Sequence, residues 1–242
     1  MKKRLFSTVL VVFLFSYFTV YAQKPILSEY PEDLYVKNIW GKNRLHNLSV
    51  NIGFGSYINI NEAEELKVYP VRSNSSHVGL RYKLRFCNFY AWGLDLNWNT
   101  SNYSIKQNSN NIFPDTLTHH KENFNFHNIG LGYYNRFNFD VKRGNIIGKY
   151  LDIGIWGNWR FSAQHTFVDN FETPQHGAYK SRTQLSELNY LTDFHWGVNA
   201  RLGINSFVIF ANYRMSDLLN SKYNFEPTPL VIGIEIDIPL EF

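Results

Sequence analysis

The sequence is poor in the features that cross-link small exported domains. Its 242 residues contain a single cysteine, Cys87, so no internal disulfide can form. Of the 24 basic residues three, at positions 2–4, belong to a short leader, which leaves 21 against 20 acidic residues and a net charge of +1. That balance gives no reason to expect a nucleic-acid partner, although the pI of the whole chain is near 9.0. Adjacent His119 and His120 lack a third ligand at a defined spacing, so no metal or other cofactor is expected.

Long apolar runs are missing after the first twenty residues. The one such run, Leu5–Val20, follows Lys2-Lys3-Arg4 and ends just before Ala22. A positive n-region, a short apolar h-region and small residues at a cut site are typical of a secretory signal peptide. We therefore expect residues 1–22 to be a signal peptide. No later run approaches the length of a membrane helix, which excludes a helical membrane bundle.

Aromatic residues are what the chain has in abundance. It contains 20 Phe, 16 Tyr and 6 Trp, yet its mean hydropathy is −0.31. A chain that is both aromatic and polar on average must separate the two kinds of residue over short distances. Strand alternation, with successive side chains on opposite faces, achieves this separation.

Eight segments show such alternation. The last is the clearest, with Ile232, Ile234, Ile236 and Ile238 on one face. Period-two segments of about ten residues, separated by turns, are the signature of a transmembrane β-barrel. We therefore predict an all-β fold, an eight-stranded antiparallel up-and-down transmembrane β-barrel over residues 46–242, preceded by a periplasmic lead at residues 23–45. The expected strands cover residues 46–60, 77–86, 90–99, 124–141, 151–161, 187–199, 207–213 and 230–242.

Alternation alone does not decide which face lies outside, because a soluble lipocalin-like barrel turns its apolar face inward. An eight-stranded interior is just wide enough to be filled by side chains, and the apolar faces carry dozens of large ones. Nine of the 15 glycines lie on the polar face, where a crowded interior needs small residues. The apolar faces contain no Asp, Glu, Lys or Arg. We therefore expect the polar face inside and the apolar face against outer-membrane lipid.

The lengths of the connections alternate and predict the orientation. The long ones are 61–75, 102–123, 168–185 and 216–229, and the short ones are 87–88, 142–149 and 203–205. Outer-membrane barrels have long extracellular loops and short periplasmic turns. The expected location is the outer membrane of a Gram-negative bacterium, with both termini in the periplasm.

The end of the chain, VIGIEIDIPLEF, carries a resemblance. Together with the signal peptide and the eight strands, it resembles the small outer-membrane β-barrel domain proteins of the broad PorT-like family. Ile236, Ile238, Leu240 and Phe242 are similar to the C-terminal signal read by the barrel-assembly machinery. The resemblance implies that this machinery and periplasmic chaperones act as partners during biogenesis. Some members of the family serve the type IX secretion system, and an envelope protein partner is implied for this chain as well.

Charged residues on the predicted inner faces form a balanced set. Buried charges need partners, so we expect a salt-bridge network that fills a closed lumen. The alternative is a conduit with a ring of charge, as in wider porins. The turn near Asn145-Ile146 is expected to bring Asp140 towards the Asp152 end of the next strand and Arg136 higher, towards Arg160, so that each needs partners from other strands. The fourteen residues are Arg81, Lys83, Arg85, Asp95, Arg136, Asp140, Asp152, Arg160, Glu187, Asp193, Arg201, Arg214, Glu235 and Asp237.

A lipid-modifying barrel enzyme is the catalytic alternative, and it requires Ser, His and a carboxylate near one rim. His165 and Ser162 fall on opposite faces by parity. His195 and Asp193 share an inner face, yet no Ser or Thr stands beside them. The sequence therefore predicts no catalytic site. The expected role is that of a structural or interaction scaffold, and the resemblance suggests an accessory of an envelope or type IX secretion system. A small passive channel is the alternative.

Overall fold

The computed structural model describes residues 39–60, 65–66, 68–105, 119–140, 146–175, 178–220 and 226–240. Side chains are described for these residues except 65–66, 172–175 and 178. All of them belong to one compact unit, Asn38–Phe242. The predicted signal peptide, residues 23–38 of the predicted lead, and Phe242 lie outside the described residues.

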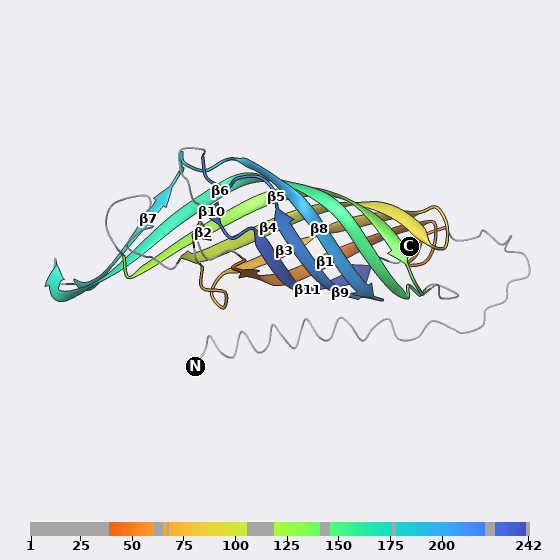
Figure 1. Ribbon diagram of the computed structural model, residues 1–242, viewed down its shortest axis with the longest axis horizontal. Coiled ribbons are helices and arrows are strands. Elements are labelled where there is room, and N and C mark those ends of the chain that lie inside the picture. Colours follow the sequence, from red (N-terminus) through yellow and green to blue (C-terminus); the bar gives the residue numbers. More distant parts are fainter. Residues whose placement is uncertain are drawn as a thin grey trace, which may run out of the picture. The chain divides into compact units, whose positions relative to one another are not determined.

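Eight long strands form a closed ring. Each strand of the ring pairs in an antiparallel manner with the next one along the chain, and β11 returns to β1 (Figure 1). This arrangement confirms the predicted eight-stranded up-and-down barrel. The ring consists of β1 (His46–Ile58), β3 (Asn74–Arg85), β4 (Tyr90–Ile105), β5 (Lys121–Asn138), β6 (Lys149–Gln175), β8 (Phe194–Ile204), β9 (Phe207–Arg214) and β11 (Leu230–Pro239).

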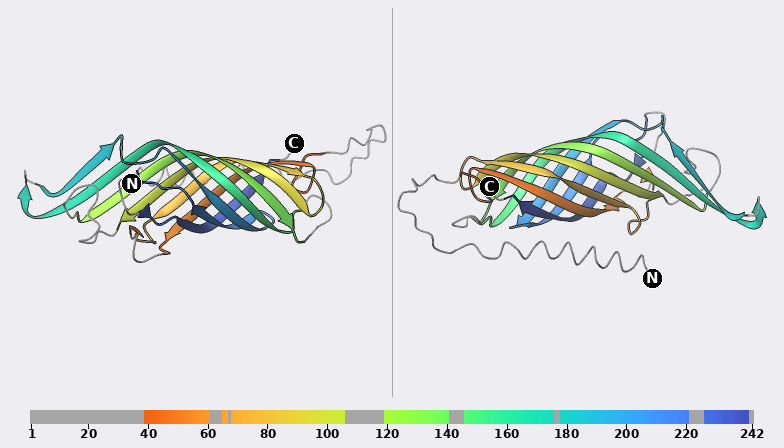
Figure 2. Two further views of the ribbon diagram at one scale, coloured as in Figure 1. Left: turned by 45° about the horizontal axis from the view of Figure 1, so that its top comes forward. Right: turned by 180° about the vertical axis from the view of Figure 1, so that it is seen from behind.

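Three further strands lie at the end of the ring where the long connections emerge. The two-residue strands β2 (Glu65–Leu66) and β10 (Glu226–Pro227) pair in parallel. Strand β7 (Ala178–Ser186) pairs with the last part of β6, and the two form a hairpin that projects beyond the barrel (Figure 2). The sequence had predicted a loop at 168–185, and this prediction is wrong. Residues 164–168 of β6 pair with β5 on one edge and with β7 on the other, so both edges of this stretch are hydrogen-bonded.

The sixth expected strand also differs from the structure. Alternation in the sequence suggested a start at residue 187, but β8 begins at Phe194. Glu187 adopts a positive φ of 57°, which ends β7, and the chain then crosses to β8 through turns and bends. Leu191 in this crossing forms an isolated bridge with Leu219. The alternation in the sequence therefore extends seven residues before the start of β8, because some side chains of the crossing are also buried.

The apolar face of the barrel lies outside, which excludes the lipocalin-like alternative. Leu131 and Ile234 are 67% and 68% exposed on the outer surface, whereas Arg81 and Arg136 inside are each only 1% exposed. Glycine on the inner face makes room for large rings: a Cβ at Gly93 would overlap the Tyr134 ring.

A β-bulge interrupts the pairing of β5 with β6. His127 pairs with Ser162 and the next residue, Asn128, pairs with Arg160, so Phe161 has no partner on β5. An extra residue in one strand reverses the faces of the side chains that follow it. His165, which parity counted along the sequence places outside, is therefore completely buried.

Candidate functional site

A chain of alternating charges crosses the lumen near the end with the short turns. Arg81 lies at its centre: Nε donates to Asp95 Oδ1 at 2.7 Å, and Nη1 donates to Glu235 Oε1 at 2.5 Å. Nη1 also lies 3.4 Å from Asp237 Oδ2. Arg201 continues the chain, because its Nη1 donates to Asp95 Oδ2 at 2.7 Å and its Nε lies 3.5 Å from Asp152 Oδ2.

Arg136 ends this chain in a bidentate pair with Asp152. The two hydrogen bonds, from Nε and Nη2 to the two carboxylate oxygens, measure 2.7 and 2.8 Å. The prediction that Arg136 is carried towards Arg160 is wrong, whereas Asp140 does lie at the Asp152 end of β6, beside Gly148. Arg136 and Asp152 are direct partners in the register of β5 and β6, because the connection between these strands begins at residue 139 and ends at 148.

Aromatic rings fill the spaces between the guanidinium groups. Tyr134 is fully buried, and Arg201 lies over its ring at 4.5 Å from the centroid. Arg136 lies 3.7 Å from the centroid of the Tyr150 ring. The flat faces of these guanidinium groups make cation–π contacts with the rings, while their N–H groups, at the edges, bind carboxylates. The result is a continuous plug of charge and aromatic rings that we call the charge plug: Arg81, Asp95, Tyr134, Arg136, Tyr150, Asp152, Arg201, Glu235 and Asp237.

The remaining predicted lumen residues lie elsewhere. Lys83 is buried and donates to the carbonyl of Lys42, and Arg85 is half-buried and donates to Asn43 Oδ1 at 2.8 Å. Residues 39–45 of the predicted lead are thereby tied to this end of the barrel. Asp140 is half-buried beyond the end of β5.

Glu187 and Asp193 are not lumen residues, and here the sequence prediction is wrong. Both side chains are exposed, Glu187 in the turn after β7 and Asp193 in the bend before β8. Neither residue is part of a strand, so strand parity does not apply to them. Arg160 and Arg214 are buried, as predicted, but at the opposite end of the lumen from the charge plug.

The end of the lumen with the long connections is closed by apolar side chains. Glu226 holds this cap together, since it accepts the backbone N–H groups of Leu218 and Leu219 at 2.9 and 2.8 Å and pairs with Arg214 Nη1 at 3.0 Å. The cap consists of Tyr57, Val68, Tyr103, Ile105, Phe124, Phe126, Leu191, Phe210, Leu218, Leu219 and Val231.

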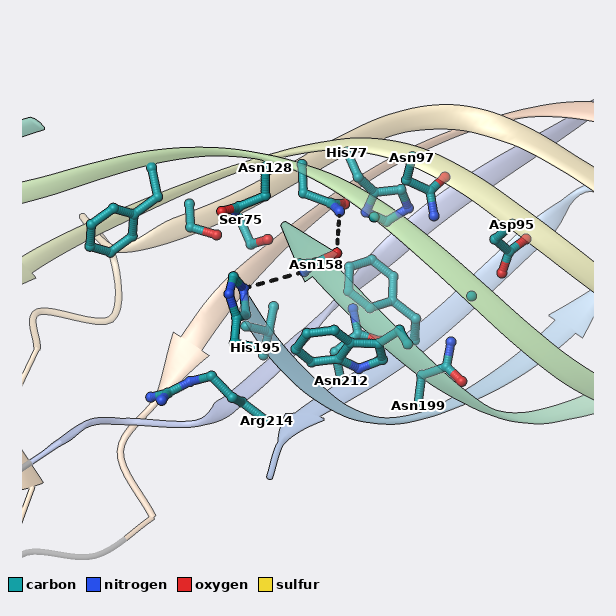
Figure 3. Close-up of a pocket in the computed structure, with 18 of the residues that line it drawn as sticks. Ser75, His77, Asp95, Asn97, Asn128, Asn158, His195, Asn199, Asn212 and Arg214 are labelled. Atoms are coloured by element: carbon teal, nitrogen blue, oxygen red, sulfur yellow. Dashed lines mark hydrogen bonds between the residues drawn. The ribbon is translucent and has the colours of Figure 1, made fainter. Parts of the chain in front are cut away.

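A small polar cavity remains between the charge plug and the apolar cap. Its volume is about 90 Å³, and amide and histidine side chains dominate its walls (Figure 3). Asn97, Asn199 and His195 each present a buried polar atom that has no protein partner in the described part of the chain. A cavity of this size and polarity holds a few water molecules. The charge plug and the apolar cap therefore block the lumen along its axis, with room for water between them.

A buried polar triad lies where β5 and β6 extend past the ring, and sequence reasoning missed it. His165 Nε2 lies 2.7 Å from Glu122 Oε1, and its Nδ1 lies 2.7 Å from the Tyr190 hydroxyl. Phe124 and Phe167 flank the imidazole at centroid distances of 3.8 and 4.1 Å. Only the bulge at Phe161 explains why His165 points inward. The triad ties the crossing between β7 and β8 to the barrel wall.

Two belts of aromatic rings surround the outer surface. The belt near the short turns includes Tyr90 beside Phe137 at 5.8 Å and Trp92 beside Tyr133 at 6.1 Å between centroids. The other belt includes Trp98, which lies 6.5 Å from Phe161. Aliphatic side chains occupy the surface between the belts. Eight residues of strand separate Tyr90 from Trp98, about 26 Å of extended chain.

Among the described residues there is no group of three or more His, Cys, Asp or Glu placed to hold a metal ion. Nor does this part of the chain contain a helix long and apolar enough to cross a membrane. The two histidines weighed as metal ligands are half-buried or exposed near the start of β5, and Nδ1 of His119 lies 2.8 Å from Asp169 Oδ1.

Comparison with known proteins found similarity to solved structures. No family model and no curated protein matches the chain. The chain is similar to Ail, the attachment invasion locus protein of Yersinia pestis, whose crystal structure was determined in complex with the heparin analogue sucrose octasulfate. The alignment covers 80% of this chain and 96% of that one, with 13% identity and a TM-score of 0.30.

Proposed function

We propose that this chain is an outer-membrane β-barrel protein that acts as a closed scaffold rather than as a pore or an enzyme. The observation that carries the proposal is the inversion of its surface: apolar side chains between two aromatic belts face outward, and the ionised residues are inside. Tryptophan and tyrosine favour the two membrane interfaces, and a closed ring leaves no backbone group unpaired in lipid. The outer membrane of Gram-negative bacteria accommodates barrels of this kind.

The lumen supports a scaffold role in preference to a passive channel. The charge plug links side chains from β3, β4, β5, β6, β8 and β11, and it closes the short-turn end. The apolar cap closes the other end. A hydrated cavity of about 90 Å³ between two closures offers no continuous water path. An enzyme would need a nucleophile activated by a histidine. Ser75 and Ser101 line the same cavity as His77 and His195, but in the described part of the chain neither hydroxyl forms a hydrogen bond with a histidine ring.

The projecting β6–β7 hairpin is the part of the scaffold best placed to meet an envelope partner. Tyr179 on this hairpin is 65% exposed, and Lys180 and Arg182 beside it are basic. A role beside the type IX secretion system is suggested by the resemblance of the sequence. If the barrel serves that system, deletion of its gene abolishes export of the system's cargo, and a point variant in the hairpin reproduces the defect.

The location of the protein gives the first test of the proposal. The mature chain should fractionate with the outer membrane, and in unheated gels it should migrate differently from the heated sample because a folded barrel resists the detergent. Recovery of the chain in the soluble periplasmic fraction contradicts the proposal.

The orientation gives a second test. If the short turns are periplasmic, trypsin added to intact cells should cut in β7 after Lys180 or Arg182, since both side chains lie on the projecting hairpin. Arg85, next to the short turn at 86–89, should be cut only after the outer membrane is permeabilised. The reverse pattern of cleavage would show that the barrel is inserted the other way round.

A further inference from the structure

Arg160 is a buried cation that forms no ion pair and no side-chain hydrogen bond within the described part of the chain. Its side chain is 6% exposed, and none of its three guanidinium nitrogens makes a hydrogen bond. The guanidinium lies over the Phe126 ring at 4.6 Å. Its backbone N–H donates to the Asp193 carbonyl at 2.7 Å, but the Asp193 side chain is exposed and forms no ion pair with it. A buried charge without a partner is costly, so this position calls for one.

His195, on the neighbouring strand, also presents an unused donor. Asn99 Nδ2 donates to Asn158 Oδ1 at 2.9 Å, which fixes the orientation of the Asn158 amide. The Asn158 Nδ2 group therefore faces His195 Nε2, at 3.4 Å (Figure 3). Because Nε2 accepts from this amide, the ring proton of neutral His195 lies on Nδ1, and Nδ1 has no partner.

Arg214 contributes a third donor from β9. Its Nη1 and Nη2 are fixed by Glu226 Oε2 at 3.0 Å, by the Ser216 carbonyl at 2.9 Å and by the Pro227 carbonyl at 2.6 Å. Only its Nε is left, buried and without a partner. Glu226 forms no hydrogen bond with Arg160, and its two oxygens accept from Arg214 and two backbone N–H groups.

His195 and Arg214 line the polar cavity and Arg160 lines a hollow beside β6, but the three residues are close in the register of the barrel. In the register of the barrel Asn158, two residues before Arg160, pairs with His195, and Gly197 pairs with Arg214. His195 interacts electrostatically with both arginines. Figure 3 places His195 and Arg214 at the same end of the cavity. Asn128 Oδ1, opposite Arg160 in the register of β5 and β6, is a buried acceptor in this region that also has no partner in the described part of the chain. No carboxylate binds the free donors, and two of the three groups are guanidinium groups, which match an anion with several oxygens.

We propose that Arg160, His195 and Arg214 bind a small oxyanion of the phosphate class. A path to Arg160 exists from the loop end. Residues 160–163 of β6 have no strand partner on the side of β8, since pairing with β8 ends at Trp159 and pairing with β7 begins at Gln164. A hollow of about 330 Å³ opens there, and it is lined by Arg160, Phe161, Ser162, Ala163, Ser186, Glu187, Leu188 and Asp193.

The hollow reaches both water and the outer apolar surface. Glu187 and Asp193 at its rim are exposed and therefore screened by solvent, whereas Phe161 is 54% exposed on the lipid-facing side. The bound group can thus be a free inorganic anion or the phosphate of a lipid. This inference goes beyond the scaffold role and does not depend on it, because it concerns a site inside the folded barrel.

The test uses the full mature chain folded in non-ionic detergent micelles, with Arg160→Gln and the exposed Arg72→Gln as matched variants. Sodium phosphate should raise the melting temperature of the wild type and of Arg72→Gln but not that of Arg160→Gln. By calorimetry, Arg160→Gln should weaken phosphate binding about tenfold to a hundredfold, the range for loss of a charge-assisted hydrogen bond. Without phosphate, Arg160→Gln should melt no lower than the wild type, because it removes an unpaired buried charge.

A second arm replaces inorganic phosphate with short-chain phosphatidic acid in the same micelles. Saturation by inorganic phosphate supports a free anion as the ligand, and an Arg160-dependent response to phosphatidic acid alone supports a lipid phosphate. If neither probe binds, or if both bind Arg160→Gln as well as the wild type, the site is not an oxyanion site.

Discussion

Replacing Arg81 by alanine is expected to lower the free energy of unfolding of the barrel by about 3–5 kcal/mol, the cost of breaking a buried charge network on one side. Arg81 contacts three carboxylates, those of Asp95, Glu235 and Asp237. Its removal leaves Asp237 without an ion-pair partner among the described residues, while Asp95 keeps Arg201 and Glu235 keeps His77. The measurement is chemical unfolding of the folded barrel in micelles or lipid vesicles.

The same variant separates the scaffold from the channel. Arg72→Ala removes an arginine from the exposed surface and should leave stability almost unchanged, so it serves as the control. In planar bilayers Arg81→Ala should remain non-conducting, because the apolar cap still closes the far end. A variant that kept its stability and conducted ions would mean that these charges line a pore.

Replacing Leu94 by arginine should lower the free energy of unfolding of the barrel in lipid by about 2–4 kcal/mol, because it places a cation near the middle of the bilayer. Leu94 is 48% exposed on the outer surface and lies between the belts that contain Tyr90 and Trp98. The change is expected to reduce the yield of folded, heat-modifiable protein in lipid vesicles. The control is Asn88→Arg, in the exposed short turn between β3 and β4.

The two variants also test the face assignment by solvent. A cation at position 94 that is in contact with water loses no hydration. Leu94→Arg should therefore lower the free energy of unfolding only where lipid covers this surface. Equal folding of Leu94→Arg and Asn88→Arg in vesicles would show that the apolar surface does not meet lipid.

The alternation of side chains made the ring predictable, and it failed where backbone geometry changes locally. Leu230–Pro239 and Tyr90–Trp98 alternate without interruption, and their strands and faces were predicted correctly. The bulge at Phe161 has no marker in the sequence, since it depends on the pairing of β5 with β6. Period-two reasoning therefore could not place His165 inside.

The composition of the lumen could be predicted, but its pairing could not. The polar faces of the alternating segments correctly predicted that Arg81, Asp95 and Arg201 are buried. Their contacts depend on the stagger between strands, which alternation does not give. Arg81 and Arg201 meet at Asp95 although 120 residues separate them in the sequence. Glu187 was misplaced because alternation suggested a strand from residue 187, whereas the structure has a turn there with a positive φ, and β8 begins only at Phe194.

The seam between β1 and β11 has a consequence for assembly. Every other neighbour in the ring is the next long strand along the chain, so those pairs can form as local hairpins, whereas this seam joins the first and last strands. Glu235 and Asp237 arrive on β11, and before closure Arg81 has only Asp95 from its own hairpin. A slip of one residue at the seam would turn both acids towards the apolar outer surface of the barrel. Arg81 therefore gains its full set of carboxylate partners only when β11 pairs with β1 in the correct register, so these ion pairs favour that register over a shifted one.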